Sequence, residues 1–125
     1  MISFDSFILK DDSPIYHQIL TFLKRGMIAG TIQNGDELPS RRVLSAMLGV
    51  NPNTVQKSYR ILEEEGLVQS HSGAKSCVML DGDKIARLRR EMLEGDGKAI
   101  VHALRQMGLD KDQALALIET YWNEV

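Results

Sequence analysis

The sequence has little cysteine, no long apolar run and no leader-like N-terminus. Its single cysteine, Cys77, cannot form a disulfide within the chain, which excludes a disulfide-stabilised scaffold. No apolar stretch approaches the ~20 residues that cross a bilayer. The first residues, MISFDSFILKDD, lack the basic and apolar regions of a signal peptide. We therefore expect a cytoplasmic protein that does not associate with a membrane.

An excess of charge of one sign is also missing, since the net charge is −2 at pH 7. Residues 1–80 carry eight Lys or Arg and eight Asp or Glu, so this part of the chain is neutral. Between Ser40 and Leu62, however, all four charged residues are basic: Arg41, Arg42, Lys57 and Arg60. Whole-chain charge therefore neither supports nor excludes binding to nucleic acid.

Catalytic and metal-binding motifs are absent as well. The three histidines, at positions 17, 71 and 102, and Cys77 do not show the spacing of metal ligands. The sequence contains no phosphate-binding loop, dinucleotide fingerprint or nucleophile–base pair. We therefore predict no enzyme activity, no catalytic or metal-binding residue and no cofactor.

A first helix is predicted over about residues 14–29. Ser13 is a suitable N-cap, and Pro14 is a suitable first helical residue. Apolar residues then recur near helical spacing, and Gly30 provides a stop. The NGD sequence at residues 34–36 next indicates a turn.

Two short helices joined by a tight turn are predicted next. Ser40 is expected to cap the first of them, and Gly49 to end it. Asn51 can cap the second with its side-chain oxygen. Pro52 fits at its first position, because the missing N–H of proline costs nothing there. This arrangement is a helix-turn-helix.

A β-hairpin is expected directly after the helix-turn-helix. Residues 67–68 and 76–80 are its predicted strands, and SHSGAK, residues 70–75, is its tip. A hairpin in this place makes the domain a winged helix. We therefore predict a mainly α fold with a small β-hairpin, in which residues 1–80 form a winged helix-turn-helix domain.

The remaining residues, 81–125, are predicted to be all helical. The apolar spacing indicates helices over about residues 83–93, 98–107 and 111–123, the last with Asp110 and Gln113 as a capping box. About forty residues in short helices cannot bury much core alone. They either complete the subunit's own core or pair with a second copy, and we favour a dimerisation segment. The predicted interface residues are Ile85, Leu88, Met92, Ile100, Leu104, Leu115, Ile118, Tyr121 and Trp122.

Residues 53–64 are predicted to have one apolar and one polar helix face. At about 100° per residue, Val55, Tyr59 and Leu62 fall on one side as a core stripe. The opposite side carries Asn53, Gln56, Lys57 and Arg60, with Thr54 beside them. Asn and Gln pair with adenine edges, Lys and Arg pair with guanine or phosphate, and a helix fits the major groove. A solvated polar face is the alternative, but the tight turn and the hairpin favour DNA. The three glutamates at residues 63–65 would repel phosphate.

Two further groups are candidate DNA contacts. Arg41 and Arg42 lie in the first turn of the preceding helix, where positive charge opposes the helix dipole by a few tenths of a kcal/mol. A nearby polyanion would offset this cost, so we favour phosphate or base contacts over a solvated pair. At the wing tip, His71, Gly73 and Lys75 suit a minor-groove or phosphate contact, with an exposed polar turn as the alternative.

Three ordered motifs resemble the GntR family of bacterial transcriptional regulators over about residues 13–79: PIYHQI, G-x-I-x-x-G-D-x-LPS-x-R and LGVNPNTV-x-K-x-Y-x-x-LE-x-EG-LV. The N-P-N-T-V-x-K-x-Y version, with its short C-terminal part, resembles the YtrA-like subfamily. The resemblance implies an operator-binding homodimer, usually a repressor, with a helical dimerisation segment. It also implies control of neighbouring ABC-transporter genes, which is frequent in this subfamily. By position, the implied DNA contacts are Arg42, Asn51, Asn53, Thr54, Gln56 and the wing around Ser72 and Gly73.

We therefore expect a sequence-specific DNA-binding regulator, a repressor that binds a palindromic double-stranded operator as a homodimer. Two other interpretations stay open. The neutral charge of residues 1–80 is compatible with a winged helix that binds a protein partner instead of DNA. Effector sensing is the third interpretation, with a small molecule bound at the dimer interface near Trp122.

Overall fold

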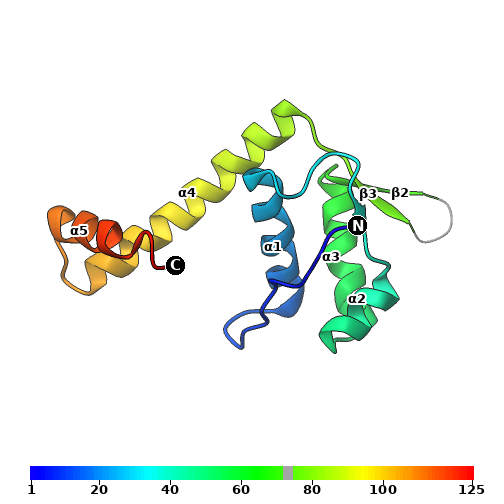
Figure 1. Cartoon of the computed structure of the whole chain (residues 1–125), viewed down its shortest axis with the longest axis horizontal. Coiled ribbons are helices and arrows are strands. Elements are labelled where there is room, and N and C mark those ends of the chain that lie inside the picture. The colour runs from blue at the N-terminus through cyan, green and yellow to red at the C-terminus, as the bar shows by residue number, and fades with distance from the viewer. Residues whose placement is uncertain (72–74) are drawn as a thin grey trace. The chain divides into compact units, whose positions relative to one another are not determined.

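The computed structural model describes residues 1–71 and 75–125 (Figure 1). The elements in chain order are α1 (Ile15–Ala29), β1 (Glu37–Leu38), α2 (Arg41–Leu48), α3 (Pro52–Glu64), β2 (Val68–Ser70), β3 (Ser76–Val78), α4 (Gly82–Gln106) and α5 (Lys111–Tyr121). They form two compact units, Met1–Leu88 and Arg89–Val125, whose boundary lies inside α4. None of the helices in the described part of the chain combines the length and the apolar character needed to cross a membrane. The predicted mainly α fold with a small β element is confirmed.

The caps of the helix-turn-helix are those that the sequence predicts. The Ser40 hydroxyl accepts a backbone hydrogen bond at the start of α2, and Gly49 ends this helix with the left-handed φ of 67° that glycine favours. Asn51 Oδ1 accepts the first free backbone N–H of α3 at 2.8 Å, and Pro52 is the first helical residue. The tight turn between α2 and α3 is therefore determined by residues that lie within it or directly beside it.

The start of α1 differs from the prediction by one residue. Pro14 is extended, with a ψ of 140°, so it occupies the N-cap position and the helix begins at Ile15. The Ser13 hydroxyl donates to the Asp12 carboxylate at 3.3 Å and does not cap the helix. The prediction that Ser13 is the N-cap is therefore wrong, whereas Gly30 ends the helix in the left-handed conformation as expected.

The sheet has one more strand than the sequence predicts. Strands β2 and β3 form the expected hairpin, and β1 adds to the other edge of β3, giving the antiparallel order β1-β3-β2. Glu37 pairs with Cys77, and Leu38 pairs with Ser76. A strand of two residues has no alternating pattern from which it could be recognised. Its pairing depends on contacts with residues far along the chain.

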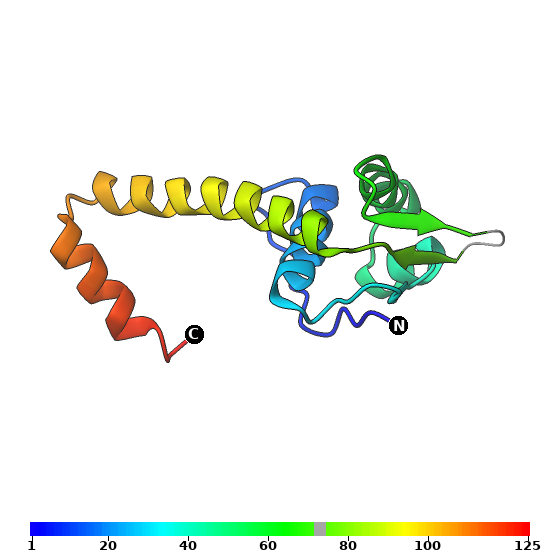
Figure 2. The same ribbon diagram turned by 90° about the horizontal axis from the view of Figure 1, so that it is seen from above.

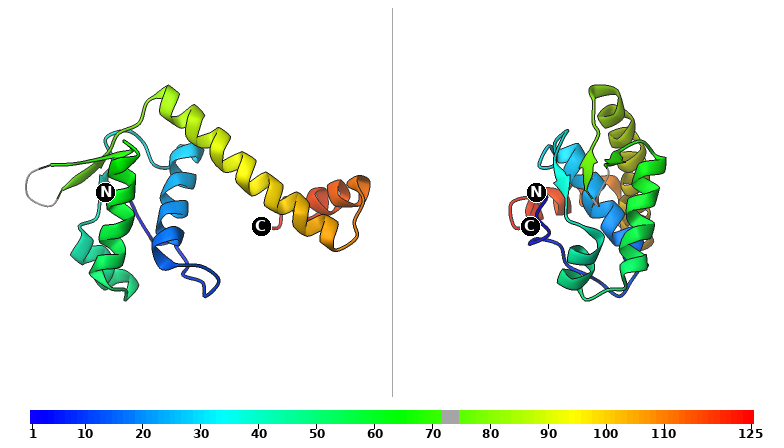
Figure 3. Two further views of the ribbon diagram at one scale, coloured as in Figure 1. Left: turned by 180° about the vertical axis from the view of Figure 1, so that it is seen from behind. Right: turned by 90° about the vertical axis from the view of Figure 1, so that its right-hand side faces the viewer.

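The core of the N-terminal unit lies between α1, α3 and the sheet. α1 and α3 lie side by side (Figure 3), and each presents one apolar stripe to the other. Ile19, Leu23, Tyr59, Leu62 and Val78 have no exposed surface at all. These residues hold the helix-turn-helix against the sheet, so the position of α3 is set by its buried side.

α4 is one long helix where the sequence predicts two. α4 runs without a break through Gly95, Asp96 and Gly97, although these residues indicate an interruption. A glycine inside a helix costs about 1 kcal/mol relative to alanine, and the strong helix formers on both sides offset that cost. Lys98 Nζ also pairs with Glu94 Oε1 at 3.0 Å across the segment. The predicted break is therefore wrong.

The chain reverses direction after α4 and continues into α5 (Figure 2). Gly108 allows the reversal because it adopts a φ of 81°. The predicted capping box is confirmed, since the Asp110 side chain and the Gln113 side chain each accept the other's backbone N–H. α5 ends at Tyr121, two residues before the predicted end.

Candidate nucleic-acid interface

α3 separates a buried stripe from an exposed polar face, as the sequence predicts. Val55, Ser58, Tyr59 and Leu62 are fully buried. The buried Ser58 hydroxyl is satisfied by the carbonyl of Tyr16, 3.0 Å away. The face on the other side of the helix is exposed and consists of Asn53, Gln56, Lys57 and Arg60. Donors and acceptors that suit base edges and phosphates therefore lie together on one side of a rigidly packed helix.

The start of α3 places two more candidate residues beside this face. Asn51 is exposed, and Thr54 is half-buried. Asn51 already has a local role, because its side-chain oxygen accepts the Asn53 backbone N–H. Its amide nitrogen stays available for a second partner.

Replacing Asn51 should separate the capping role from binding. Asn51→Ala should lower the free energy of unfolding by about 1 kcal/mol, because the first backbone donors of α3 lose their acceptor. Asn51→Ser keeps a capping oxygen and should restore most of that stability while lacking the amide. Denaturant unfolding and DNA titration of both variants check this. An Asn51→Ala protein as stable as the parent would contradict the capping role.

Two basic residues of the polar face have partners within the chain. Lys57 Nζ lies 3.9 Å from the centre of the Tyr16 ring, and Arg60 Nε lies 3.9 Å from Glu64 Oε1. Both contacts are on the surface, so they orient the side chains without removing their charges from solvent. Lys57 in particular is held above α1 in a defined position.

The two arginines at the start of α2 point in different directions. Arg42 is exposed and has no ion-pair partner among residues 1–71 and 75–125. Arg41 Nη2 lies 3.2 Å from Glu63 Oε1, and its guanidinium carbon lies 5.1 Å from the centre of the Tyr59 ring. Arg41 Nε is buried and has no hydrogen-bond partner in the described part of the chain. The structure therefore presents Arg42 to solvent and directs Arg41 into the domain.

Tyr59 connects Arg41 to the loop before α2. Its hydroxyl donates to the Pro39 carbonyl at 2.7 Å. Burial raises the pKa of the Tyr59 phenol well above its usual range, an effect larger than the lowering by the Arg41 guanidinium. The phenol therefore stays protonated and keeps donating this hydrogen bond at any pH at which the protein is used.

The described part of the wing carries two of the four predicted wing residues. His71 and Lys75 are exposed, and the His71 backbone N–H donates to the Lys75 carbonyl at 2.7 Å. This bond continues the β2–β3 ladder beyond Ser70 and Ser76. Ser72 and Gly73, the other two candidates, lie outside the described residues.

The three glutamates that close α3 each have a basic partner, which the sequence analysis missed. The carboxylate–nitrogen distances are 3.2 Å for Glu63 with Arg41, 3.9 Å for Glu64 with Arg60 and 2.9 Å for Glu65 with Lys24. The Glu64 pair follows from i,i+4 spacing and could have been found in the sequence. The other two join different elements and leave no local signal. Their negative charges are thus locally compensated.

The predicted interface residues divide between the two units. Leu88 is only 4% exposed and belongs to the N-terminal unit. Most of its surface is therefore packed within its own subunit, and its place in a dimer contact stays a prediction. Ile85, Met92 and Leu104 are half-buried. The exposed members of the set are Ile100, Leu115, Ile118, Tyr121 and Trp122.

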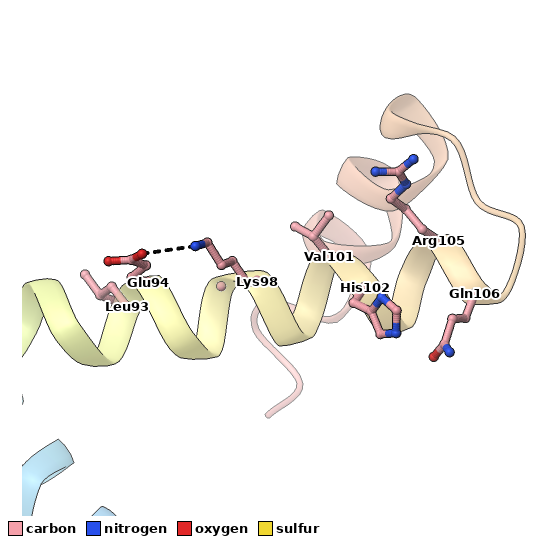
Figure 4. A pocket seen from close by; sticks show the side chains of 8 residues that line it. Leu93, Glu94, Lys98, Val101, His102, Arg105 and Gln106 are labelled. Carbon is pink, nitrogen blue, oxygen red and sulfur yellow. Dashed lines mark hydrogen bonds and ion pairs between the residues drawn. The ribbon is translucent and has the colours of Figure 1, made fainter.

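Further exposed apolar residues of α4 were not among the predicted ones. Leu93 and Val101 are 62% and 54% exposed, and they lie on either side of Gly97. Figure 4 shows them on the hollowed face of α4 with several polar side chains. The lining of this hollow is Leu93, Glu94, Gly97, Lys98, Val101, His102, Arg105 and Gln106.

Among the described residues, no group of three or more His, Cys, Asp or Glu side chains is placed to hold a metal ion.

Comparison with known proteins identifies the family of this helix-turn-helix. The model of the gntR family of bacterial regulatory proteins matches residues 15–78. The chain belongs to the GntR family. GntR proteins are transcriptional regulators with a DNA-binding helix-turn-helix and are not enzymes, so the predicted family, fold and class of function are confirmed.

Relatives of similar length are among the matching GntR proteins. The transcriptional repressor YtrA of Bacillus subtilis is 31% identical over 105 residues, which are 84% of this chain and 76% of YtrA. The B. subtilis regulator YhcF is 30% identical over 116 residues, which are 90% of this chain and 93% of YhcF. A solved GntR regulator from Listeria monocytogenes has a TM-score of 0.76 at 28% identity, covering 90% of this chain and 98% of its own. The similarity therefore includes the C-terminal helices as well as the winged helix.

Proposed function

We propose that this GntR protein is a repressor that binds a palindromic operator as a homodimer. The proposal rests mainly on the exposed polar face of α3, which lies opposite the fully buried stripe of the same helix. Side chains of this kind, presented at the second helix of a helix-turn-helix, suit the major groove. Repression is supported by the relative YtrA, which is named a transcriptional repressor.

The side chains of the interface divide into readers of bases and binders of phosphate. Asn53 and Gln56 lie near the N-terminal half of α3, where they can reach base edges. Arg42 precedes α3 in the sequence and Lys75 follows it, and both side chains are exposed. Their positive charges suit contacts with the phosphates of the two DNA strands. Uncharged amides at the centre would give the operator an adenine preference.

Dimerisation is supported by the apolar surface of the C-terminal unit. Leu115, Tyr121 and Trp122 are 53%, 52% and 73% exposed, and α5 has no buried residue. Large apolar residues exposed together favour association with another surface. In a symmetric dimer, two copies of α3 face half-sites about one helical turn or more apart, so the operator is a palindrome.

The regulated genes follow from the subfamily and not from the geometry. Because YtrA-like proteins often control neighbouring ABC-transporter genes, the operator is expected upstream of such genes in the same region of the chromosome. DNase footprinting on the region upstream of the protein's own gene tests this. Footprints confined to unrelated promoters would refute this part of the proposal.

Salt dependence distinguishes DNA binding from a protein-interaction role. Phosphate contacts release counterions, so operator binding should weaken steeply as salt rises. Titration of a labelled palindromic fragment at several salt concentrations measures the slope. A chain that binds no DNA but holds a protein partner at all salt concentrations would refute the proposal.

Gln56→Ala should relax sequence preference at one base pair by about 1–3 kcal/mol, because the amide is expected to pair with a base edge. Selection from a randomised operator, carried out with the parent and with the variant, measures that preference. Lys57→Ala is the matched control, since it removes a neighbouring charge and should weaken all sequences alike. A Gln56→Ala protein with the parent's preference at every position would contradict base reading by this residue.

A further inference from the structure

Glu63 lies where three elements of the N-terminal unit meet. It belongs to the last turns of α3, and its side chain is 34% exposed. Its Oε1 accepts a hydrogen bond from Arg41 Nη2 at 3.2 Å and another from the Ser70 hydroxyl. One carboxylate oxygen thus joins the first turn of α2, the end of α3 and the last residue of β2.

The partners of Glu63 are themselves fixed. The Arg41 guanidinium lies over the buried Tyr59 ring, so its position is determined by the core. On the other side, Ser70 pairs with Ser76 across the hairpin, and their hydroxyls are 3.2 Å apart. The Glu63 carboxylate therefore connects the core of the helix-turn-helix to both strands at the base of the wing.

We propose that Glu63 is a positioning residue for DNA recognition, which sets the wing relative to α3 without touching DNA. This inference rests on the proposed function, in which α3 and the wing bind the operator together. Ser70 is the last residue of β2, and the exposed His71 follows it directly. Fixing Ser70 to α3 therefore fixes the direction in which the wing leaves the domain.

The same contact gives Arg41 a role other than the phosphate or base contact expected from its place in the sequence. Its Nη2 is engaged by Glu63, its face is against Tyr59, and its side chain is 25% exposed. Arg41 thus acts through Glu63 by holding the carboxylate in position. The neighbouring Arg42, exposed and without an ion-pair partner in the described residues, is the one that suits phosphate.

Glu64 and Glu65 are natural controls for Glu63. All three are consecutive residues of the same sequence, and each loses its carboxylate and one negative charge on replacement by alanine. Glu64 pairs along its own helix with Arg60, and Glu65 pairs with Lys24 of α1. Neither carboxylate pairs with a residue in the described part of the wing. The Glu64 pair is exposed and contributes little to folding, whereas the Glu63 and Glu65 pairs are partly buried. The melting temperature of each variant is therefore measured beside its affinity.

The test compares Glu63→Ala, Glu64→Ala and Glu65→Ala in the full chain. The probe is a duplex selected by the parent protein from randomised DNA. Removing a negative charge near DNA by itself strengthens binding, so Glu64→Ala and Glu65→Ala should bind equally or more tightly. Glu63→Ala should instead bind about tenfold more weakly, because it removes the oxygen that accepts from Arg41 and Ser70 and this loss outweighs the charge effect. A loss of affinity in Glu63→Ala beside a gain in the two controls is the decisive result.

Hydroxyl-radical footprinting shows which contact is lost. With Glu63→Ala, protection at the flank reached by the wing should fade, while protection over the major-groove site of α3 remains. Ser70→Ala removes the wing end of the same contact without changing charge and should give the same footprint. A Glu63→Ala footprint and affinity equal to those of Glu64→Ala would overturn the inference.

A double-mutant cycle tests the role given to Arg41. If Arg41 acts through Glu63, Arg41→Gln should add nothing to the binding loss of Glu63→Ala. If Arg41 binds phosphate, the two losses should add, and the salt slope of binding should fall by about one. The latter result would overturn the role of Arg41. A parent protein that binds no DNA at all would instead refute the proposed function, so the two failures are distinguishable.

Discussion

A chain shortened to end at Leu88 should be monomeric at micromolar concentration and should bind a palindromic operator roughly 100-fold more weakly than the full chain. In a dimer, once one copy has bound its half-site, the second copy binds the other half-site intramolecularly. This gain in affinity is commonly about 100-fold or larger. Removal of residues 89–125 eliminates the exposed apolar surface of α4 and α5 on which we expect dimerisation to depend. Sedimentation velocity and operator titration measure both effects.

The truncation point follows from the contacts at the start of α4. Lys84 Nζ donates to the Gly66 carbonyl at 2.7 Å, and Leu88 is buried, so residues 82–88 belong to the winged-helix domain. Affinity for a single half-site is the control and should be unchanged. A truncated protein that remains dimeric would contradict the expected role of the C-terminal unit.

Tyr59→Ala should lower the free energy of unfolding by about 3–5 kcal/mol, because it empties the site of a large, fully buried aromatic side chain. That is a substantial part of the roughly 5–15 kcal/mol by which domains are stable. The substitution also leaves the Pro39 carbonyl without its donor and removes the ring under Arg41. Urea unfolding followed by circular dichroism measures the loss.

Tyr59→Phe is the matched control, since it keeps the ring and removes only the hydroxyl. It should cost about 1 kcal/mol, the usual effect of one lost hydrogen bond. A Tyr59→Ala protein that loses no more stability than Tyr59→Phe would show that the ring is not the packing element inferred from its burial.

The helix-turn-helix could be predicted from the sequence because its signals are local. The residues that begin and end its helices act on backbone groups only a few positions away, so the sequence is enough to place them. They are Ser40, Gly49, Asn51 and Pro52. The separation of Tyr59 from the polar face follows in the same way from helical periodicity.

The features that the sequence did not predict depend on distant partners or on small energy differences. Leu38 forms a strand because Ser76 lies beside it, and Arg41 points inward because it contacts both Tyr59 and Glu63. The continuity of α4 through Gly95 and Gly97 is decided by a cost of about 1 kcal/mol for each glycine, which flanking residues overcome. Helix propensities alone therefore do not predict whether α4 continues or breaks at these glycines.

The order of strands in the sheet also has a consequence for folding kinetics. β2 and β3 are joined by the short wing and can pair early, because closing a short loop costs little entropy. β1 pairs with the other edge of β3 across α2 and α3, which lie between Leu38 and Ser76 in the chain, so this pairing closes a much longer loop. We therefore expect the central strand to be completed late, by a contact between distant residues. In the parent protein, the sheet and the helices are then expected to unfold as one cooperative unit, because β1 joins the wing strands to the chain that leads into α2.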